Sequence, residues 1–261
     1  VPVNTNTTWC HRMVLTPKHN GGVRRNIDFQ PLNKACQRQT HHCEPPLQQA
    51  MMVPQKALKT KLDAFQGFHS VKLSEESKQY TAFITPWGRY RYITCPMGWK
   101  ASTDAYNDRY DQIIREVRRK AKVTDDLLLW DDDLEKAFIH TGEVLTLAAN
   151  HGIIQNPEKF EFAKKELEWA GVKLSESGAA PPPSHVKAIK DYPAPQNITD
   201  MRSFFALVEQ VSPYYAVKPH LAPFRELLKK GQEWYWDHTL DRLFDEAKAE
   251  ITSRVTEGIR R

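Results

Sequence analysis

The sequence has little cysteine, no long apolar run and no basic, apolar leader. Its 261 residues include four Cys, which are too few for a disulfide scaffold and indicate reduced thiols in an intracellular protein. No stretch of 18 apolar residues occurs, so we expect no segment that spans a membrane. The opening Val-Pro-Val-Asn-Thr shows neither a secretory signal nor an initiator Met. We therefore expect a piece of a longer polyprotein or a processed product.

Several common catalytic and binding motifs are also missing. No Gly-rich phosphate loop precedes a helix, and no G-x-S-x-G motif or Cys/His pairing indicates acyl chemistry. Cys36, His41, His42 and Cys43 are metal-capable, but their spacing differs from that of a zinc knuckle or finger. The composition, 40% hydrophobic and 26% charged, is that of a globular chain with one large domain or two small ones.

Positive charge is concentrated at the start of the chain. Residues 1–62 contain nine Lys and Arg and only two acids, whereas the whole chain has a net charge of +5. A basic first quarter indicates a polyanionic partner, such as nucleic acid or nucleotide phosphates, or else an ordinary solvated basic surface.

Local patterns predict an α+β arrangement for the first two thirds of the chain. The expected strands form a ribbon at 9–30, a hairpin at 79–94 with its turn at 86–88, a tight hairpin at 123–130, and single strands at 58–63, 153–163 and 167–174. The expected helices are a short one within the loop 31–56, one at 101–122, and one that follows Asp131, Asp132 and Asp133 and runs to about Asn150.

The composition changes at Ser175. Residues 178–183, GAAPPP, have the signature of a linker. Helix-like stretches follow at 184–191, 199–212, 221–230 and 238–252. We therefore expect a boundary near residue 176, between an α+β body and a small helical part.

Three acids are placed where catalytic carboxylates are often found. Asp63 ends an expected strand, and Asp125 and Asp126 lie at an expected hairpin turn. Neighbouring strands could bring them together, and mutually repelling carboxylates are suited to Mg²⁺. Two such ions can activate an attacking hydroxyl and stabilise a leaving pyrophosphate. From spacing alone, an Asp-Asp pair is more often an ordinary turn or helix cap.

Seven segments in order resemble the reverse transcriptases of gypsy-type LTR retrotransposons and, more distantly, the retroviral enzymes. The resemblance runs from about Trp9 to Glu250 and includes HNGGVRRNIDFQPLNK (19–34), KLDAFQGFHSVKL (61–73), TAFITPWGRYRYITCPMGWKAST (81–103), VTDDLLLW (123–130), HGIIQNPEKFEF (151–162), ELEWAGVKLS (166–175) and KAIKDYPAPQNITDMRSFFALVEQVSPYY (187–215).

This resemblance implies an α+β right-hand polymerase. Its fingers would begin at 1–62, its palm would occupy 63–175 with an intervening fingers segment at about 72–100, and 176–261 would form a helical thumb or connection-like region. The implied activity is RNA- and DNA-directed DNA polymerisation. Its partners would be dNTPs and an RNA or DNA template with a primer, and no membrane. A dimer with another reverse transcriptase chain stays open, and the expected location is a cytoplasmic retroelement particle or the nucleus.

The resemblance also assigns roles to residues. Asp63, Asp125 and Asp126 would hold two Mg²⁺ ions, for which Mn²⁺ can substitute, with help from the backbone carbonyl of Ala64. The residues implied for dNTP binding are Lys18, Arg24, Phe68, Met97, Gly98 and Lys159; those implied for primer and template binding are Val123, Thr124, Trp169, Gly171 and Val172. Simpler explanations stay open: a solvated ribbon for Lys18 and Arg24, core packing for Phe68, and a surface position for Lys159.

The sequence departs from its family at the expected catalytic turn. Val123 stands where the family has Tyr, and Thr124 stands where Val, Leu or Met is usual. Nearby, Gln30 replaces Arg and Met97 replaces Phe. The three carboxylates are present, which favours an active polymerase. The alternative hypothesis is a weak or inactive, domesticated nucleic-acid-binding module.

Overall fold

The computed structural model describes residues 7–17, 21–37 and 40–259. Lys18 and the side chain of Arg24, both expected to bind dNTP, lie outside the described residues. The chain forms two compact units. Unit 1 comprises residues 1–43, 60–129 and 135–161, and unit 2 comprises 44–59, 130–134 and 162–261. The division falls within three strands, β3 (Leu58–Asp63), β7 (Asp126–Asp131) and β8 (Glu161–Lys164).

One sheet of unit 1 is built from two hairpins. β1 (His11–Pro17) pairs antiparallel with β2 (Val23–Ile27), β4 (Phe83–Thr85) pairs antiparallel with β5 (Gly88–Tyr90), and β1 joins the two hairpins by pairing parallel with β4. The resulting order is β2-β1-β4-β5. A cluster around the buried Ile27, Phe29 and Leu32 covers one face of this sheet. Both hairpins were predicted, but the arms of the second are only three residues long.

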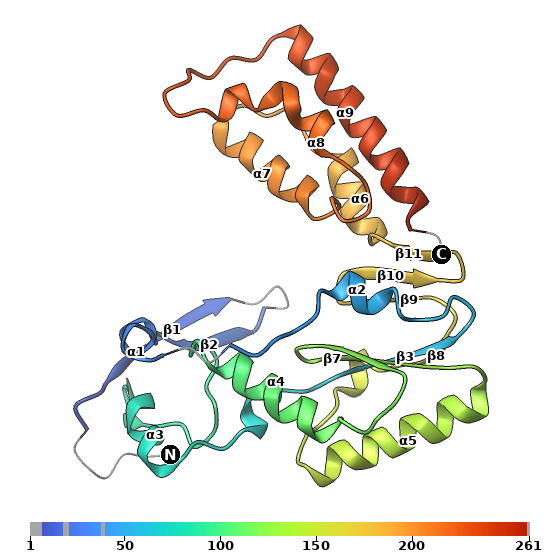
Figure 1. Cartoon of the computed structure of the whole chain (residues 1–261). Coiled ribbons are helices and arrows are strands. Elements are labelled where there is room, and N and C mark those ends of the chain that lie inside the picture. Colours follow the sequence, from blue (N-terminus) through green and yellow to red (C-terminus); the bar gives the residue numbers. More distant parts are fainter. Residues whose placement is uncertain (1–6, 18–20, 38–39, 260–261) are drawn as a thin grey trace. The chain divides into compact units, whose positions relative to one another are not determined.

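The second sheet has the strand order β6-β7-β3-β8, with β6 at Lys120–Val123. β7, with the sequence DLLLWD, is buried from Leu127 to Asp131, as its continuous apolar run indicates. Helix α4 (Ser102–Ile113) contributes Tyr106 and Tyr110 to the core beside this sheet. Helix α5 (Leu134–Asn150) contributes a stripe at helical spacing, which consists of Ala137, Thr141, Val144 and Ala148. The two helices can be followed in green in Figure 1.

Short helices complete unit 1. They are α1 (Gln30–Ala35), η1 (Gly67–Ser70), α3 (Glu75–Lys78), η2 (Gln79–Thr81) and η3 (Pro157–Lys159), where η marks a 3₁₀-helix. α3 begins at Ser74, whose hydroxyl accepts a hydrogen bond from the backbone N–H of Ser77. Asn156 caps η3 by accepting from the N–H of Glu158.

Unit 2 combines a small sheet with a helical bundle. The sheet has the order β11-β10-β9, formed by β9 (Leu167–Trp169), β10 (Val172–Ser175) and β11 (Gly178–Ala180). Helix α2 (Pro46–Ala50) also belongs to this unit. The bundle consists of α6 (Pro183–Lys190), α7 (Ile198–Glu209), α8 (Lys218–Leu221), η4 (Ala222–Phe224), η5 (Glu226–Leu228) and α9 (His238–Glu257). Its core centres on Phe204, Phe224 and Phe244, which are fully buried.

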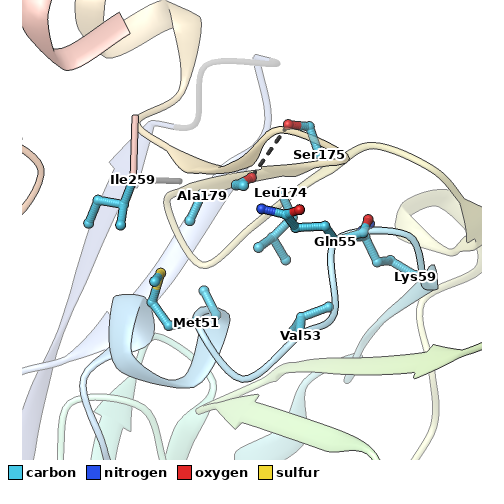
Figure 2. Close-up of a pocket in the computed structure, with 10 residues that line it drawn as sticks. Met51, Val53, Gln55, Lys59, Leu174, Ser175, Ala179 and Ile259 are labelled. Carbon is cyan, nitrogen blue, oxygen red and sulfur yellow. Dashed lines mark hydrogen bonds between the residues drawn. The ribbon is translucent and has the colours of Figure 1, made fainter. Parts of the chain in front are cut away.

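A small cavity in unit 2 lies beside a buried lysine (Figure 2). The Lys59 side chain is only 1% exposed, and its ammonium donates hydrogen bonds to the carbonyls of Gln55, Ala57 and Lys165 at 2.9–3.0 Å. Burial lowers the pKa of this ammonium. The cavity has a volume of about 10 Å³, which is room for about one water molecule. It is therefore too small for a nucleotide.

Two sequence predictions fail because strand pairing overrides local composition. The helix expected at 101–122 ends at Ile113, and Lys120–Val123 forms β6 because it pairs with β7. The linker expected at 178–183 begins with β11, in which Gly178, Ala179 and Ala180 pair with β10. In both cases the strand pairs with its neighbour in the sequence across a two-residue turn, and this pairing outweighs the local composition.

Two other predictions are only partly correct. The strand expected at 153–163 is reduced to β8, because Pro157 begins a 3₁₀-helix there. The helix expected at 221–230 is broken into short turns around Pro223. The predicted helix at 238–252 is confirmed and continues to Glu257. In the described part of the chain, every helix is too short or too polar to traverse a lipid bilayer.

Candidate active site

The turn between β6 and β7 presents two adjacent aspartates. Val123 pairs with Asp126 as the last rung of the hairpin, so Thr124 and Asp125 form a two-residue turn. Thr124 has φ of +52°. A β-branched residue rarely adopts this left-handed conformation, which costs on the order of 1–3 kcal/mol. The tight turn was predicted from the sequence, whereas its strain was not.

The end of β3 is hydrogen-bonded to this turn. The N–H of Ala64 donates to the carbonyl of Asp125 at 3.0 Å, and the carbonyl of Asp63 accepts from the N–H of Asn156 at 2.8 Å. An isolated antiparallel bridge also joins Ala64 to Gln155. The backbone thus fixes Asp63 between the β6–β7 turn and the segment before η3, as expected if neighbouring strands bring Asp63 and Asp125 together.

The acids of this site disfavour one another's ionised form by charge repulsion. Burial first, and then the negative charges of Asp63 and Asp126, together raise the pKa of Asp125 to about 6. The pKa of Asp126 is also raised, first by burial and then by the charge of Asp63. The site therefore concentrates more negative charge than its protein surroundings neutralise.

Lys159 provides one positive charge to the acids. Its ammonium donates a hydrogen bond to Oδ2 of Asp63 at 2.9 Å. That hydrogen bond raises the pKa of Lys159, although its side chain is 60% exposed. Lys159 thus lies beside the three acids, with Asp63 as its hydrogen-bond partner.

The acids suit a divalent cation because of their negative charge and because one carboxylate oxygen lacks a hydrogen-bond partner among the described residues. Among the described residues, no hydrogen-bond donor reaches the buried Oδ1 of Asp125. Such an orphaned carboxylate oxygen is a ligand that hard cations prefer. In the same described ranges, no three His, Cys, Asp or Glu side chains are already gathered closely enough to hold a metal ion. An ion would therefore have to draw the side chains of Asp63, Asp125 and Asp126 closer together.

The described residues that are expected around the nucleotide lie in several segments of unit 1. Phe68 in η1 is half-buried, and its ring meets the Tyr106 ring edge-on with centroids 5.6 Å apart. Met97 is 43% exposed. Gly98 has φ of +89°, and a Cβ there would lie 3.5 Å from the carbonyl oxygen of Ile27. Arg24 lies opposite Thr16 in the β1–β2 ladder.

Asn33 is a residue of this region that the sequence analysis missed. Its Nδ2 donates to the carbonyl of Gly98 at 2.9 Å, and its Oδ1 accepts from the N–H of Lys100 at 2.9 Å. Both hydrogen bonds fix the loop after Met97. The only available signal was its place in the segment 19–34, which resembles the fingers ribbon.

A polar network around the buried Lys122 of β6 was also missed. The ammonium of Lys122 donates to Oδ1 of Asn107 at 2.8 Å and lies 3.2 Å from Oδ1 of Asp111. The other carboxylate oxygen of Asp111 is 2.6 Å from Nε2 of His41. This network ties β6 to α4. Asn107 and Asp111 are four residues apart on α4, which is the one sequence signal that could have paired them.

Of the residues expected to bind primer and template, Val123 and Thr124 lie at the β6–β7 turn of unit 1, and Trp169, Gly171 and Val172 lie in unit 2. Trp169 and Val172 are buried, and they flank the turn formed by Ala170 and Gly171. Both turn residues have positive φ, +47° and +77°, as a type I′ hairpin turn requires. Any primer contact here would use the exposed turn rather than the Trp169 ring.

Comparison with known proteins identifies the family. A family model described as reverse transcriptase (RNA-dependent DNA polymerase) matches residues 16–174. The match covers more than half of the chain and includes all three acids. The chain belongs to the reverse transcriptase family.

The curated relatives of this chain include a viral polyprotein and a transposon polyprotein. A putative enzymatic polyprotein of Cassava vein mosaic virus is 28% identical over 77% of this chain and 31% of its own length. The Transposon Tf2-3 polyprotein of Schizosaccharomyces pombe is 24% identical over 92% of this chain and 18% of its own length. The predicted resemblance to retroelement reverse transcriptases is confirmed. The narrower gypsy-type assignment stays a prediction. The chain spans about a third or less of these relatives.

Solved reverse transcriptases share the fold. A foamy viral protease-reverse transcriptase in complex with double-stranded DNA has a TM-score of 0.89 at 15% identity, over 96% of this chain and 45% of that chain. The same viral protein in complex with an RNA/DNA hybrid has a TM-score of 0.84 at 15% identity, over 95% of this chain and 34% of that chain. The predicted α+β right-hand polymerase fold is confirmed.

Proposed function

We propose that this reverse transcriptase domain extends a DNA primer on an RNA or DNA template, as the polymerase of a retroelement polyprotein. The observation that carries the proposal is the acidic turn: Asp125 has a buried oxygen without a donor among the described residues, and Asp63 and Asp126 raise its pKa. Such a site gains stability when a cation binds.

The expected reaction joins the primer 3′-hydroxyl to the α-phosphate of a dNTP and releases pyrophosphate. Two divalent ions, Mg²⁺ or Mn²⁺, would supply the charge that activates the hydroxyl and stabilises the leaving group. Asp63 and Asp125 would be the main ligands, with Asp126 as a weaker one and the carbonyl of Ala64 as a further oxygen. The rigid hydrogen bonds of Ala64 and Asn156 hold these groups at fixed backbone positions.

Lys159 has a second role in the proposed reaction. Its ammonium already binds Oδ2 of Asp63 and remains largely exposed. When ions occupy the carboxylates, this ammonium is free to turn towards the departing pyrophosphate and to donate a proton. Lys159→Ala should therefore slow nucleotide incorporation, and Lys159→Arg should restore only the part of the rate that depends on positive charge, because a guanidinium does not give up its proton.

The test is a primer-extension assay with Mg²⁺ or Mn²⁺. Wild type should extend a primer with dNTPs, and Asp63→Asn or Asp125→Asn should abolish extension without unfolding the protein. Asp191→Asn, at an exposed aspartate outside the site, is the matched control. Extension at the wild-type rate in either site variant would contradict the proposal.

A second function, a nucleic-acid-binding module with little or no catalysis, is favoured by the composition of the turn. Val123 lacks the ring and hydroxyl of the family's Tyr, and Thr124 is strained. Binding of primer–template without extension in either metal, with all three acids present, would support this function. We further propose that the domain acts in a cytoplasmic retroelement particle or in the nucleus. A dimer with another reverse transcriptase chain is tested by measuring the mass of the purified protein in solution.

A further inference from the structure

Tyr110 of helix α4 contacts two segments that lead to the acids of the candidate site. Its side chain is fully buried. Its hydroxyl accepts a hydrogen bond from Nε2 of Gln155 at 3.2 Å, and the ammonium of Lys122 lies 5.5 Å from the centre of its ring. No step of the proposed reaction uses Tyr110, although this one side chain joins both segments.

The contact with Gln155 supports the position of Asp63. Gln155 forms an isolated antiparallel bridge with Ala64, and the N–H of the next residue, Asn156, donates to the carbonyl of Asp63 at 2.8 Å. The backbone of residues 155–156 therefore holds the end of β3. The hydrogen bond from the Gln155 side chain to Tyr110 fixes that backbone to α4.

The same helix holds β6, the strand that leads into the β6–β7 turn. The buried ammonium of Lys122 donates to Oδ1 of Asn107 at 2.8 Å and lies 3.2 Å from Oδ1 of Asp111, both on α4. A cation over an aromatic ring is attracted to the face of that ring, so the Tyr110 ring adds a third contact from α4. Helix α4 is thus an element that both acid-bearing segments share.

The neighbouring Tyr106 shows that burial alone does not give a hydroxyl this role. Tyr106 lies one turn earlier on α4, is also fully buried, and has its ring centre 5.6 Å from that of Tyr110. Among the residues that the structure describes, its hydroxyl has no hydrogen-bond partner. Such a hydroxyl has lost its bonds to water without replacement. The Tyr110 hydroxyl, by contrast, binds a residue that supports the site.

We propose that Tyr110 is a positioning residue, whose hydrogen bond to Gln155 fixes the segment of Asp63 relative to the β6–β7 turn. Within the described ranges, the acids are not yet gathered closely enough to hold an ion. An ion has to draw their side chains together, and fixed backbone segments leave only side-chain rotation for that step. A misplacement of about 1 Å can cost on the order of a hundredfold in rate. The inference rests on the proposed function, because the positioned acids are those of the polymerase site.

The first experiment measures Mn²⁺ binding without nucleic acid or dNTP, so that its outcome is independent of catalysis. Mn²⁺ is titrated into the protein, and the electron paramagnetic resonance signal of the free ion reports how much is bound. Tyr110→Phe keeps the ring and removes only the hydroxyl. It should bind Mn²⁺ about tenfold more weakly than wild type, because loss of a group that orients metal ligands typically costs about 10- to 100-fold in affinity.

Tyr106→Phe is the matched control for this titration. It removes a hydroxyl from the same helix at the same depth, and that hydroxyl has no partner in the described part of the chain. This variant should bind Mn²⁺ as wild type does. Circular dichroism verifies that every variant is folded.

The second experiment separates a positioning role from a general structural one. In single-nucleotide incorporation with Mg²⁺, Tyr110→Phe should lower kcat about tenfold and leave KM for dNTP unchanged, since the removed hydrogen bond involves none of the residues expected at the nucleotide. Gln155→Leu removes the donor of the same hydrogen bond and should have the same effect. The double variant should be no worse than either single variant, because both changes remove one shared interaction.

Three results would overturn this inference. The first is a wild type that binds no Mn²⁺, or a Tyr110→Phe variant that binds it as tightly as wild type. The second is a Tyr106→Phe variant that loses as much as Tyr110→Phe, which would indicate a general effect on packing. The third is a double variant whose loss is the product of the two single losses, because Tyr110 then does not act through Gln155. Absence of primer extension by wild type, by contrast, would contradict the proposed function, and the Mn²⁺ titrations would still decide the role of Tyr110.

Discussion

Removal of the charge of Asp125 should stabilise the protein while it abolishes polymerisation. The folded-state pKa of this carboxyl is about 6, against an ordinary value of 3.8, because of burial and the charges of Asp63 and Asp126. A shift of this size corresponds to about 3 kcal/mol for a fully buried group. Since Asp125 is only about half-buried, solvent screening reduces the expected gain for Asp125→Asn to about 1–2 kcal/mol at pH 7.

This gain should depend on pH in one direction. Below about pH 4 the carboxyl is protonated in the folded and unfolded chains alike, so the variant and wild type should have similar free energies of unfolding. Between about pH 4 and pH 6 the unfolded chain loses its proton first, and wild type is destabilised as the pH rises. Asn carries no charge at any of these pH values, so its advantage should appear across this window and be complete above it.

Urea denaturation at pH 4, 5, 6 and 7 in the presence of a chelator measures this effect, with Asp191→Asn as the control. Addition of Mg²⁺ at pH 7 should then stabilise wild type more than Asp125→Asn, because an ion that binds only the folded state adds its binding free energy. An Asp125→Asn variant that is no more stable than wild type at pH 7, or equally stabilised at every pH, would refute the repulsion described for this site.

Four other changes have outcomes that follow from the structure. Phe68→Ala should admit ribonucleotides in incorporation assays, because removal of the ring would open the space that a 2′-hydroxyl needs. If the variant rejects ribonucleotides as well as wild type does, the ring packs only against Tyr106. Gly67→Ala should destabilise by about 1–3 kcal/mol in urea, since its Cβ would lie 2.6 Å from the Tyr106 ring. Val123→Tyr should raise the rate of single-nucleotide incorporation, and a slower variant would indicate that the neighbouring space has filled in. Primer–template affinity should fall steeply with salt, and an affinity unchanged from low to moderate salt would contradict backbone binding.

The strands and turns that the sequence predicted correctly are those with a complete local signal. The hairpin of β6 and β7 has apolar residues on both sides of a short acidic turn, and β3 ends in an acid. Each of these patterns spans fewer than ten residues and requires no knowledge of a distant partner. The adjacency of Asp63 and Asp125 was expected from their places at a strand end and a hairpin turn and was supported by the family resemblance, and the hydrogen bond between Ala64 and Asp125 agrees with it.

The features that the sequence did not predict are those that depend on long-range contacts. The exception is residues 120–122, which have the composition of a helix but pair with the neighbouring strand β7 across a two-residue turn. Lys59 and Lys122 have the composition of surface residues but are buried, because carbonyls or polar side chains distant in the sequence satisfy their ammonium groups. No periodicity in the sequence marks such a partner.

Sequence and structure together explain the turn between β6 and β7. The sequence shows Thr124 as a departure from the family, and the structure shows that this departure carries positive φ. A strained β-branched residue persists only where the surroundings hold it, and here the β6–β7 ladder and the hydrogen bond from Ala64 do so. The turn therefore keeps Asp125 and Asp126 in place at a cost in stability. That cost and the repulsion among the acids both lower the stability of the folded protein, and a bound divalent cation would offset the repulsion.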